Sequence, residues 1–456
     1  MAKRPKPAKS AAADQAVPVP PAAPTHRAAV RMYRQGLGDC LLITLPRDGM
    51  APFRIMIDCG LVLGMPGAND KMREVMAHIV TTLDGAPLDM LVVTHPHWDH
   101  VSGFNQAAVD FPKIAVKQVW MGWTEDASDD LARKLSSVMQ NAETQLRSAV
   151  AKLTAFGATR DADQAASLLG FLGAAKGSGG GTTRDAVEAA RRKVATPHYC
   201  TPGEPPFEIP GANARIYVLG PPRDEAELRQ MDPTARAPET YSMTALNGLF
   251  GMGDALAGDG SGNPFTANVA IPWDEAQTMP FFQTHYAAAD SAWRRIDSEW
   301  LNDTTSFALL LDRAVNNSSL ALAIELDGGE VLLFAADAQV GNWMSWLKLK
   351  WKVGSRKVTG PDLIARSTIY KVGHHASLNA SLRAEGVEKM DVLDFALVPV
   401  DAKAAFDRKW GNNIPFPDLL KALGSKAKRG VLRSDQDWTG APDRLTSDPL
   451  FYEVFV

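Results

Sequence analysis

The feature that most constrains how this 456-residue chain can fold is a series of short apolar runs, each bounded by Gly, Pro or Asp. Runs of this length that are rich in Val, Ile and Leu are typical of strands buried on one or both faces. The expected strands form two batches, residues 29–33, 40–45, 53–58, 89–95, 114–120 and 215–220, then residues 307–312, 319–326, 330–337, 368–373, 393–400 and 451–456. Amphipathic helical stretches lie between them. The sequence therefore predicts an α/β protein with two packed sheets and helices outside.

The chain divides into a tail and one large body. Residues 1–28 are rich in Ala, Pro and Lys, which predicts a disordered tail. Residues 29–456 are expected to form a single domain. Two segments do not fit the sheets and are predicted to be insertions: residues 125–195, mainly helical, and residues 223–300, poor in strand signal. The glycine-rich run at residues 176–183 lacks the order of a phosphate-binding loop, so we interpret it as a linker.

Composition excludes several functional classes. The 48 basic and 52 acidic residues give a net charge of −4, so the whole chain is not an electrostatic nucleic-acid binder. No apolar run approaches the roughly 20 residues that span a bilayer, and the N-terminal residues lack the apolar stretch of a secretory signal. The three cysteines, Cys40, Cys59 and Cys200, form no CxxC pair, which argues against a disulfide framework. We therefore expect a cytoplasmic protein that does not bind membranes.

Three histidines and an aspartate lie within six residues at the end of the fourth expected strand. His95 and His97 alternate along extended backbone, so both can reach one metal ion. Asp99 and His100, in the following turn, can be aimed at a second ion. Imidazole and carboxylate groups without thiolate suit zinc, manganese or iron and leave positions open for water. Because the chain has only nine histidines, this cluster predicts a metal site.

This HxHxDH pattern is the signature of the metallo-β-lactamase fold, and the chain resembles that family elsewhere too. Residues 36–43 and 55–60 resemble the family's opening hairpin, in which an Asp, here Asp58, lies beneath the metal-binding His residues. Three later segments are similar to the subgroup exemplified by the C-terminal domain of the competence protein ComEC: residues 316–322, 331–337 and 370–377. The resemblance covers residues 29–400 apart from the insertions, and it implies a four-layer αββα metallo-β-lactamase sandwich.

The resemblance also implies roles for later residues. Asp337 would bridge two divalent ions, zinc or manganese, although a strand-end Asp can instead cap the next helix. One of His374 and His375 would complete the second site. Because neighbouring strand residues point oppositely, we expect His375 to be the ligand and His374 to face the substrate as a phosphate contact or acid, with the reverse order still open. The expected metal ligands are His95, His97, Asp99, His100, Asp337 and His375, and the expected catalytic groups are Asp99 and His374.

The chain departs from the subgroup at a few positions. Ala336 and Ala376 stand where the subgroup usually has Gly, which leaves the backbone path intact unless a positive φ is needed there. Typical lactamases also carry a further metal-binding His in mid-chain, which the ComEC-like subgroup generally lacks. His198, beside Cys200, is the nearest candidate for it, although a loop His of this kind is more often exposed to solvent.

Two ions sharing Asp337 would lower the pKa of water from about 15.7 to near 7, which predicts hydrolysis of a phosphodiester, ester, lactone or amide. The ComEC-like resemblance favours a phosphodiester. Residues 343–375 also contain seven basic residues and one acidic residue, interleaved with Trp343, Trp346 and Trp351. This pattern suits a nucleic-acid strand, and equally a helix with buried Trp and solvated Lys side chains.

These observations leave three hypotheses. The first is a binuclear metal-dependent phosphodiesterase, of which a nuclease is one form. The second is a hydrolase of a small ester, lactone or thioester, in which the insertions form a lid and Phe281, Phe282 and Trp293 line a closed pocket. The third is a non-catalytic scaffold, which the retention of every expected ligand disfavours.

Overall fold

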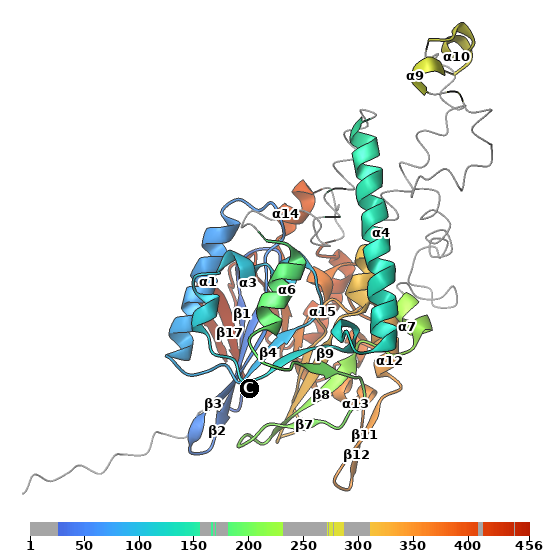
Figure 1. Cartoon of the computed structure of the whole chain (residues 1–456). Coiled ribbons are helices and arrows are strands. Elements are labelled where there is room, and N and C mark those ends of the chain that lie inside the picture. Colours follow the sequence, from blue (N-terminus) through green and yellow to red (C-terminus); the bar gives the residue numbers. More distant parts are fainter. Residues whose placement is uncertain are drawn as a thin grey trace, which may run out of the picture.

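The computed structural model describes residues 26–155, 166, 169, 181–230, 271, 273–276, 278–286, 311–408, 414–441 and 443–456. Within them the strands form two large sheets and one hairpin (Figure 1). The first sheet contains, in spatial order, β16 (Leu445–Ser447), β17 (Phe451–Phe455), β1 (Ala29–Tyr33), β2 (Cys40–Arg47), β3 (Met50–Cys59), β4 (Met90–Val93), β5 (Val119–Gly122) and β6 (His198–Cys200). The second contains β15 (Gly430–Arg433), β14 (Phe395–Val398), β13 (Ser367–Lys371), β10 (Val331–Phe334), β9 (Ala321–Leu326), β8 (Ala214–Gly220) and β7 (Phe207–Glu208). The hairpin joins β11 (Lys350–Val353) to β12 (Arg356–Thr359).

Helices account for much of the remaining described chain. They are α1 (Ala68–Leu83), α2 (Trp98–Val101), α3 (Gly103–Gln106), α4 (Asp130–Ala155), α6 (Thr183–Arg191), α7 (Glu225–Arg229), α9 (Trp273–Ala276), α10 (Pro280–His285), α12 (Val340–Trp346), α13 (Gly360–Ala365), α14 (Ala402–Asp407) and α15 (Pro417–Lys426). Short 3-10 turns are η1 (Phe111–Lys113), η2 (Trp123–Glu125), η6 (His374–Ala376) and η7 (Val387–Lys389). None of the helices in the described residues combines the length and apolar character needed to cross a bilayer. The mixture of helices with large sheets confirms the expected α/β class.

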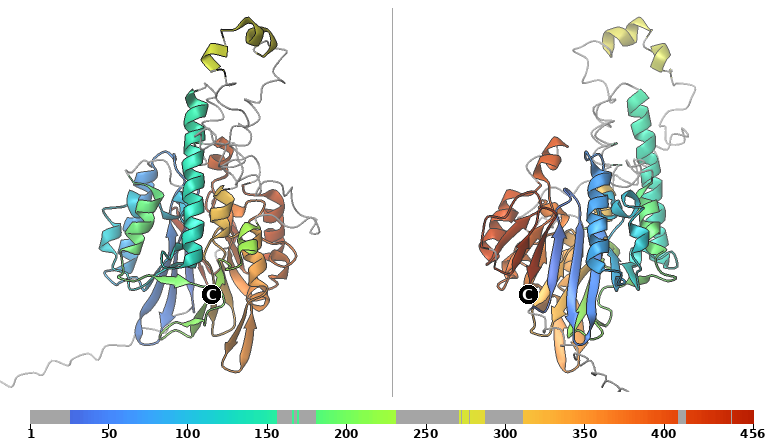
Figure 2. Two further views of the ribbon diagram at one scale, coloured as in Figure 1. Left: turned by 45° about the vertical axis from the view of Figure 1, so that its right-hand side comes forward. Right: turned by 90° about the vertical axis from the view of Figure 1, so that its left-hand side faces the viewer.

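Both faces of each sheet carry apolar side chains. Each sheet therefore packs against the other sheet with one face and against helices with the opposite face. Along β2, Leu41 and Ile43 point into the core between the sheets, whereas Cys40 and Leu42 point toward helices. Apolar side chains of α1, α3 and α6 cover the outer face of the first sheet. Those of α12, α13 and α15 cover the outer face of the second sheet. Figure 2 shows the sheets lying between these two sets of helices.

Most expected strands form, with differences at two of them. The run at residues 114–120 forms a strand only from Val119; the residues after η1 bend, and before Val119 only Val116 pairs, through an isolated bridge with Leu88. Residues 307–310 lie outside the described residues, and residues 311–317 are helical, so the strand expected at residues 307–312 is wrong at its described end. The strands that the pattern did not predict, such as β6 and β7, are two to four residues long and too short to show a period.

The tail and the insertions are described only in part. Residues 1–25 lie outside the described residues, but Ala28, expected in the tail, is fully buried and Arg27 pairs with Glu330. The folded body therefore begins before residue 29. In the expected insertion at residues 125–195, α4 projects beyond the sheets (Figure 1), whereas α6 packs on the first sheet and belongs to its helical layer. Most of the insertion at residues 223–300 lies outside the described residues.

The strands that carry the candidate site all end at one edge of the two sheets. β3 runs parallel to β4, and β10 runs parallel to β13 and through it to β14. The carboxyl ends of parallel strands meet at the same edge. The segments that follow these ends include two residues with left-handed backbone, Ala336 (φ 49°) and Ala376 (φ 60°). Both alanines stand where the ComEC-like subgroup has glycine, so the positive φ that would favour glycine is present here.

A glycine should therefore be tolerated unusually well at residue 376. Left-handed backbone costs an L-residue about 1–2 kcal/mol, which offsets the lost methyl group and the extra freedom of glycine in the unfolded chain. We expect Ala376→Gly to change the free energy of unfolding by less than about 0.5 kcal/mol. Ala323→Gly, at an equally buried position in β9, should lower it by about 1–2 kcal/mol. Urea unfolding of both variants tests this, and equal losses would contradict it.

Candidate metal centre

The loop after β4 is fixed by a carboxylate from β3. Asp58 accepts hydrogen bonds from the backbone N–H of Thr94 (2.8 Å) and from the Thr94 hydroxyl (2.6 Å). The Nδ1–H of His100 donates to the same carboxylate at 2.8 Å. Asp58 is fully buried and has left-handed backbone (φ 55°), which short polar side chains tolerate better than most. One buried carboxylate thus holds both ends of the HxHxDH segment.

The first two histidines of the motif face each other. His95 Nε2 lies 3.1 Å from His97 Nδ1. Two donor atoms bound to one ion at about 2.1 Å each are separated by roughly this distance. Burial lowers the pKa of His95 and lowers that of His97 to about 4, so both rings are neutral at pH 7. A neutral imidazole is the form that binds a metal.

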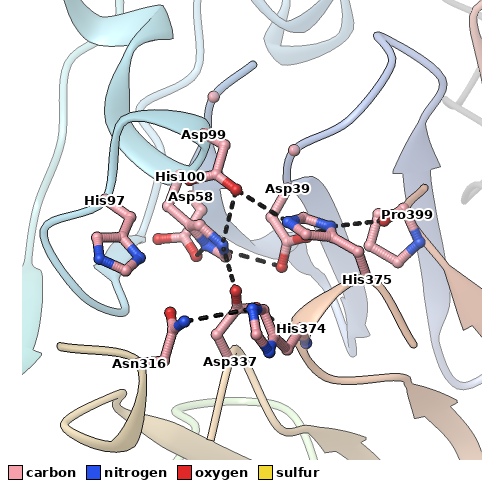
Figure 3. Close-up of polar contacts among 12 residues, drawn as sticks. Asp39, Asp58, His97, Asp99, His100, Asn316, Asp337, His374, His375 and Pro399 are labelled. Atoms are coloured by element: carbon pink, nitrogen blue, oxygen red, sulfur yellow. Dashed lines mark hydrogen bonds and ion pairs between the residues drawn. The ribbon is translucent and has the colours of Figure 1, made fainter. Parts of the chain in front are cut away.

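A second group joins the motif to the other sheet. Donor atoms of Asp99, His100, Asp337 and His375, all buried, lie within 4.8 Å of one another (Figure 3). His375 Nε2 is 2.9 Å from Asp99 Oδ2, and His100 Nε2 is 3.3 Å from Asp337 Oδ2. Asp99 and His375 are separated by 276 positions in the chain, so this group exists only in the folded protein.

The carboxylates of this group are ionised at neutral pH. Burial raises the pKa of Asp99, but His100 and a hydrogen bond from His375 lower it more, to about 2. Burial also raises the pKa of Asp337, but His100 and Lys371 lower it well below its usual range. Burial lowers the pKa of His100 and His375, but the neighbouring carboxylates raise it more, which favours the protonated rings while no metal is bound. Anionic oxygens and imidazole nitrogens therefore converge on the same buried space, and a divalent cation, which this donor set suits, would displace those protons.

The residues fit a metal by a second criterion. Asp99 Oδ1 is buried with no hydrogen-bond partner in the described part of the chain. A buried carboxylate oxygen without a partner is costly unless a cation or water satisfies it. Four of the six residues expected to bind metal form one buried group that can hold an ion, and His95 and His97 face each other beside it.

Two further buried charges, Asp39 and Lys371, lie beneath this group. Asp39 pairs with Lys371, whose ammonium also lies 3.5 Å from Asp337 Oδ1 and donates to the Ala336 carbonyl at 3.1 Å. Lys371 is 1% exposed. Lys371 is one of the seven basic residues counted in residues 343–375, and the prediction that it is exposed there is wrong, because β13 directs its side chain into the site.

The pair of histidines after β13 lies on a left-handed turn rather than on a strand. His374, His375 and Ala376 all have positive φ, so strand alternation does not apply to them. His375 Nδ1–H donates to the Pro399 carbonyl at 2.7 Å, which leaves Nε2 facing Asp99. The side-chain amide of Asn316 donates to His374 Nε2 at 3.3 Å. The two neighbours thus have different surroundings, and His375 occupies the place expected for the ligand.

His374 is held as a neutral imidazole. Its Nδ1–H donates to the Ser377 hydroxyl at 2.7 Å, and that hydroxyl donates to Asn379. Burial lowers the pKa of His374, so the ring is uncharged at neutral pH. The expected role of His374 as a phosphate contact or acid stays a prediction. A neutral His374 at the edge of the site remains compatible with hydrogen bonding to a substrate.

His198 lies apart from the metal-facing group. Its Nε2 is 3.0 Å from Glu204 Oε1, and the side chain is half exposed on β6. Cys200 lies nearby but belongs to the core between the sheets. The described structure thus places His198 in a local ion pair rather than in the mid-chain ligand position of typical lactamases.

The aromatic and basic residues after α12 have separate environments. Trp343 and Trp346 are fully buried, as the core interpretation expects. The exposed cations lie largely on the β11–β12 hairpin. Arg356 of this hairpin pairs with Glu325, which lies opposite Val331 at the start of β10, whereas Asp337 follows the end of β10. The hairpin therefore lies at the other end of the sheet from the metal-facing group.

Sequence reasoning missed three residues of the site: Asp39, Asp312 and Lys371. Asp312 Oδ1 lies 3.7 Å from His97 Nε2. Asp312 belongs to the helix at residues 311–317, for which the sequence pattern predicted a strand. A signal for Asp39 existed in two glycines, Gly38 directly before it and Gly60 after β3, which both lie against the backbone of Asp99. A Cβ on Gly60 would lie 2.3 Å from the Asp99 carbonyl oxygen, so this glycine permits the close approach of the two loops.

Comparison with known proteins gives no relative. No family model matches the chain, and no curated protein matches it. Function must therefore be inferred from the geometry and chemistry of the site.

The pH dependence of stability should reveal the environment of Asp312 in metal-free protein. Burial, followed by the charges of Asp99 and Asp337, raises the pKa of Asp312 to about 8. The folded state then keeps a proton that the unfolded state, with a pKa of about 3.9, releases. The free energy of unfolding should therefore fall as pH rises from about 4 to about 8.

The variant Asp312→Asn lacks this proton. Between pH 5 and pH 8 it should gain at least about 1 kcal/mol of stability relative to the original protein. Urea unfolding in the presence of a chelator measures the difference at each pH. Parallel pH profiles for the two proteins would contradict a raised pKa at Asp312.

Proposed function

We propose that this chain is a metal-dependent hydrolase with the metallo-β-lactamase fold and a binuclear site. The observation that carries the proposal is the convergence of buried imidazole nitrogens and carboxylate oxygens at the carboxyl ends of strands from both sheets. His95 and His97 would hold the first ion, while Asp99, His100 and His375 would hold the second, and Asp337 is the carboxylate that would serve both.

The roles of these residues follow from their surroundings. Two zinc or manganese ions would supply Lewis acidity and lower the pKa of water to near 7. Asp99 keeps Oδ1 without a partner in the described part of the chain, so this oxygen can accept a hydrogen bond from the attacking water and orient it. His374, fixed by Asn316 and Ser377, offers a neutral hydrogen-bonding ring at the edge of the site.

A phosphodiester is the substrate class that we propose. The support is the resemblance of residues 370–377 to the ComEC-like subgroup and the donor set of imidazoles and carboxylates without thiolate, which suits zinc or manganese, ions that bind phosphate oxygens. The remote position of the exposed hairpin cations gives a long nucleic acid no obvious electrostatic track into the site. A short or terminal phosphodiester needs no such track.

A small ester, lactone or thioester is the second candidate. The burial of the metal-facing group favours it, since a buried site admits compact substrates more easily than polymers. The structure tests part of the expectation that the insertions form a lid over a closed aromatic pocket. Phe281 is 60% exposed on α10, so it does not line a closed pocket, and Trp293 lies outside the described residues.

Metal-dependent turnover tests the proposal. Protein stripped with a chelator should be inactive on a chromogenic phosphodiester, and zinc or manganese should restore hydrolysis. Asp337→Ala and Asp99→Ala should each lower kcat/KM by at least about 100-fold, because each removes a charged group from the reacting centre. Asp70→Ala, an exposed carboxylate on α1, is the matched control and should keep full activity.

The same assay separates the two substrate classes. Restored hydrolysis of a chromogenic carboxylic ester or lactone, with the phosphodiester untouched, would replace the first candidate by the second. Full activity in Asp337→Ala with a folded protein would reject the site itself. Circular dichroism of each variant shows whether a loss of activity reflects the site or the fold.

A further inference from the structure

Of the four histidines expected to bind metal, three share one arrangement: one ring nitrogen faces the cluster and the other meets an outer oxygen. The pairs are His95 with the Thr94 hydroxyl at 3.1 Å, His100 with Asp58 at 2.8 Å and His375 with the Pro399 carbonyl at 2.7 Å. An outer acceptor of this kind selects the tautomer and orientation of a metal-binding imidazole. The donor atoms are therefore already aimed before any ion arrives.

His97 has the same arrangement, but its outer oxygen comes from Asp312, on a distant segment of the chain. Its Nδ1 faces His95 Nε2, so Nε2 must carry the proton when Nδ1 binds an ion. That Nε2 lies 3.7 Å from Asp312 Oδ1, within ion-pair range. Metal binding at Nδ1 makes the Nε2–H more acidic, which strengthens its attraction to a carboxylate.

Asp312 is held in place by the helix that carries it. Its side chain is 14% exposed, and the Asn316 amide, one turn later, donates to Asp312 Oδ2 at 3.3 Å. The same amide reaches His374 Nε2. The helix at residues 311–317 thus contacts both the first histidine pair and the turn after β13.

We propose that Asp312 is a positioning residue for the first metal ion: it contacts Nε2 of His97 and so turns Nδ1 toward the ion. Asp58 has the corresponding role at the second ion, where it holds Nδ1 of His100 and leaves Nε2 facing the cluster. The inference rests on the proposed function only for the presence of two ions. It adds a residue from outside the HxHxDH motif and outside the three later segments, residues 316–322, 331–337 and 370–377, on which the likeness to the ComEC-like subgroup is based. It also assigns the two carboxylates to different ions, which makes their removal distinguishable.

Zinc binding, measured without any substrate, tests the proposal. The full-length protein is titrated with zinc in competition with a chromophoric chelator, which gives the number of ions and the affinity of each. We expect two ions in the original protein. Asp312→Ala should weaken one of them by about 10- to 100-fold and leave the other unchanged. His97→Ala should affect the same ion.

Two comparisons distinguish positioning from a general structural effect. Asp312→Asn keeps an oxygen that accepts the Nε2–H, so its zinc affinity should lie closer to the original than that of Asp312→Ala. Asp70→Ala, which removes an exposed carboxylate, should bind zinc normally. Circular dichroism confirms that each variant is folded.

Several outcomes would overturn the proposal. Unchanged zinc affinities in Asp312→Ala, with one ion lost in His97→Ala, would remove any role for Asp312. An Asn variant as weak as the Ala variant would indicate direct coordination instead of positioning. A failure of the proposed function is recognisable separately, since zinc would bind as expected while no phosphodiester or ester is hydrolysed.

Discussion

The carboxylate of Asp58 is the interaction on which the site depends. It joins the end of β3 to the loop after β4 through Thr94, and it also fixes the ring of His100. These bonds lie in a fully buried environment, where hydrogen bonds to a charged acceptor are strong and their loss is costly. The HxHxDH segment thereby leaves the sheet in one defined conformation. Without this anchor, the donor atoms would not converge with those from the second sheet.

Charge balance explains why such a site is retained inside the protein. The carboxylates of Asp39, Asp58, Asp99 and Asp337 are buried in one region, and Lys371 is the neighbouring ammonium that the described structure places there. Burying so many carboxylates destabilises a folded protein unless positive charge offsets them. Lys371 offsets Asp39, its closest partner. The remaining negative charge favours divalent cations, so the arrangement that opposes folding also drives metal binding.

Local patterns predicted the parts of the structure that depend on nearby residues. Apolar runs placed most strands, and the HxHxDH spacing singled out His and Asp side chains of one loop that lie close together in the fold. Asp312 escaped prediction because its helix resembles a strand in composition and because its contact with His97 crosses the whole fold. Lys371 looked like one more exposed cation, since burial depends on the strand register that only the folded sheet fixes. Contacts between distant segments, rather than local propensity, decided both errors.

The position of positive charge constrains the substrate more than the metal ligands do. Exposed lysines of the β11–β12 hairpin lie beyond the start of β10, whereas Asp337 and His375 follow the ends of β10 and β13. An anionic polymer attracted to the hairpin would therefore meet the sheet at the wrong end. Lys371, which is close enough to act, is buried against Asp39 and Asp337. The divalent ions themselves would then attract an anionic substrate. This arrangement favours a reacting group that is small or lies at the end of its chain.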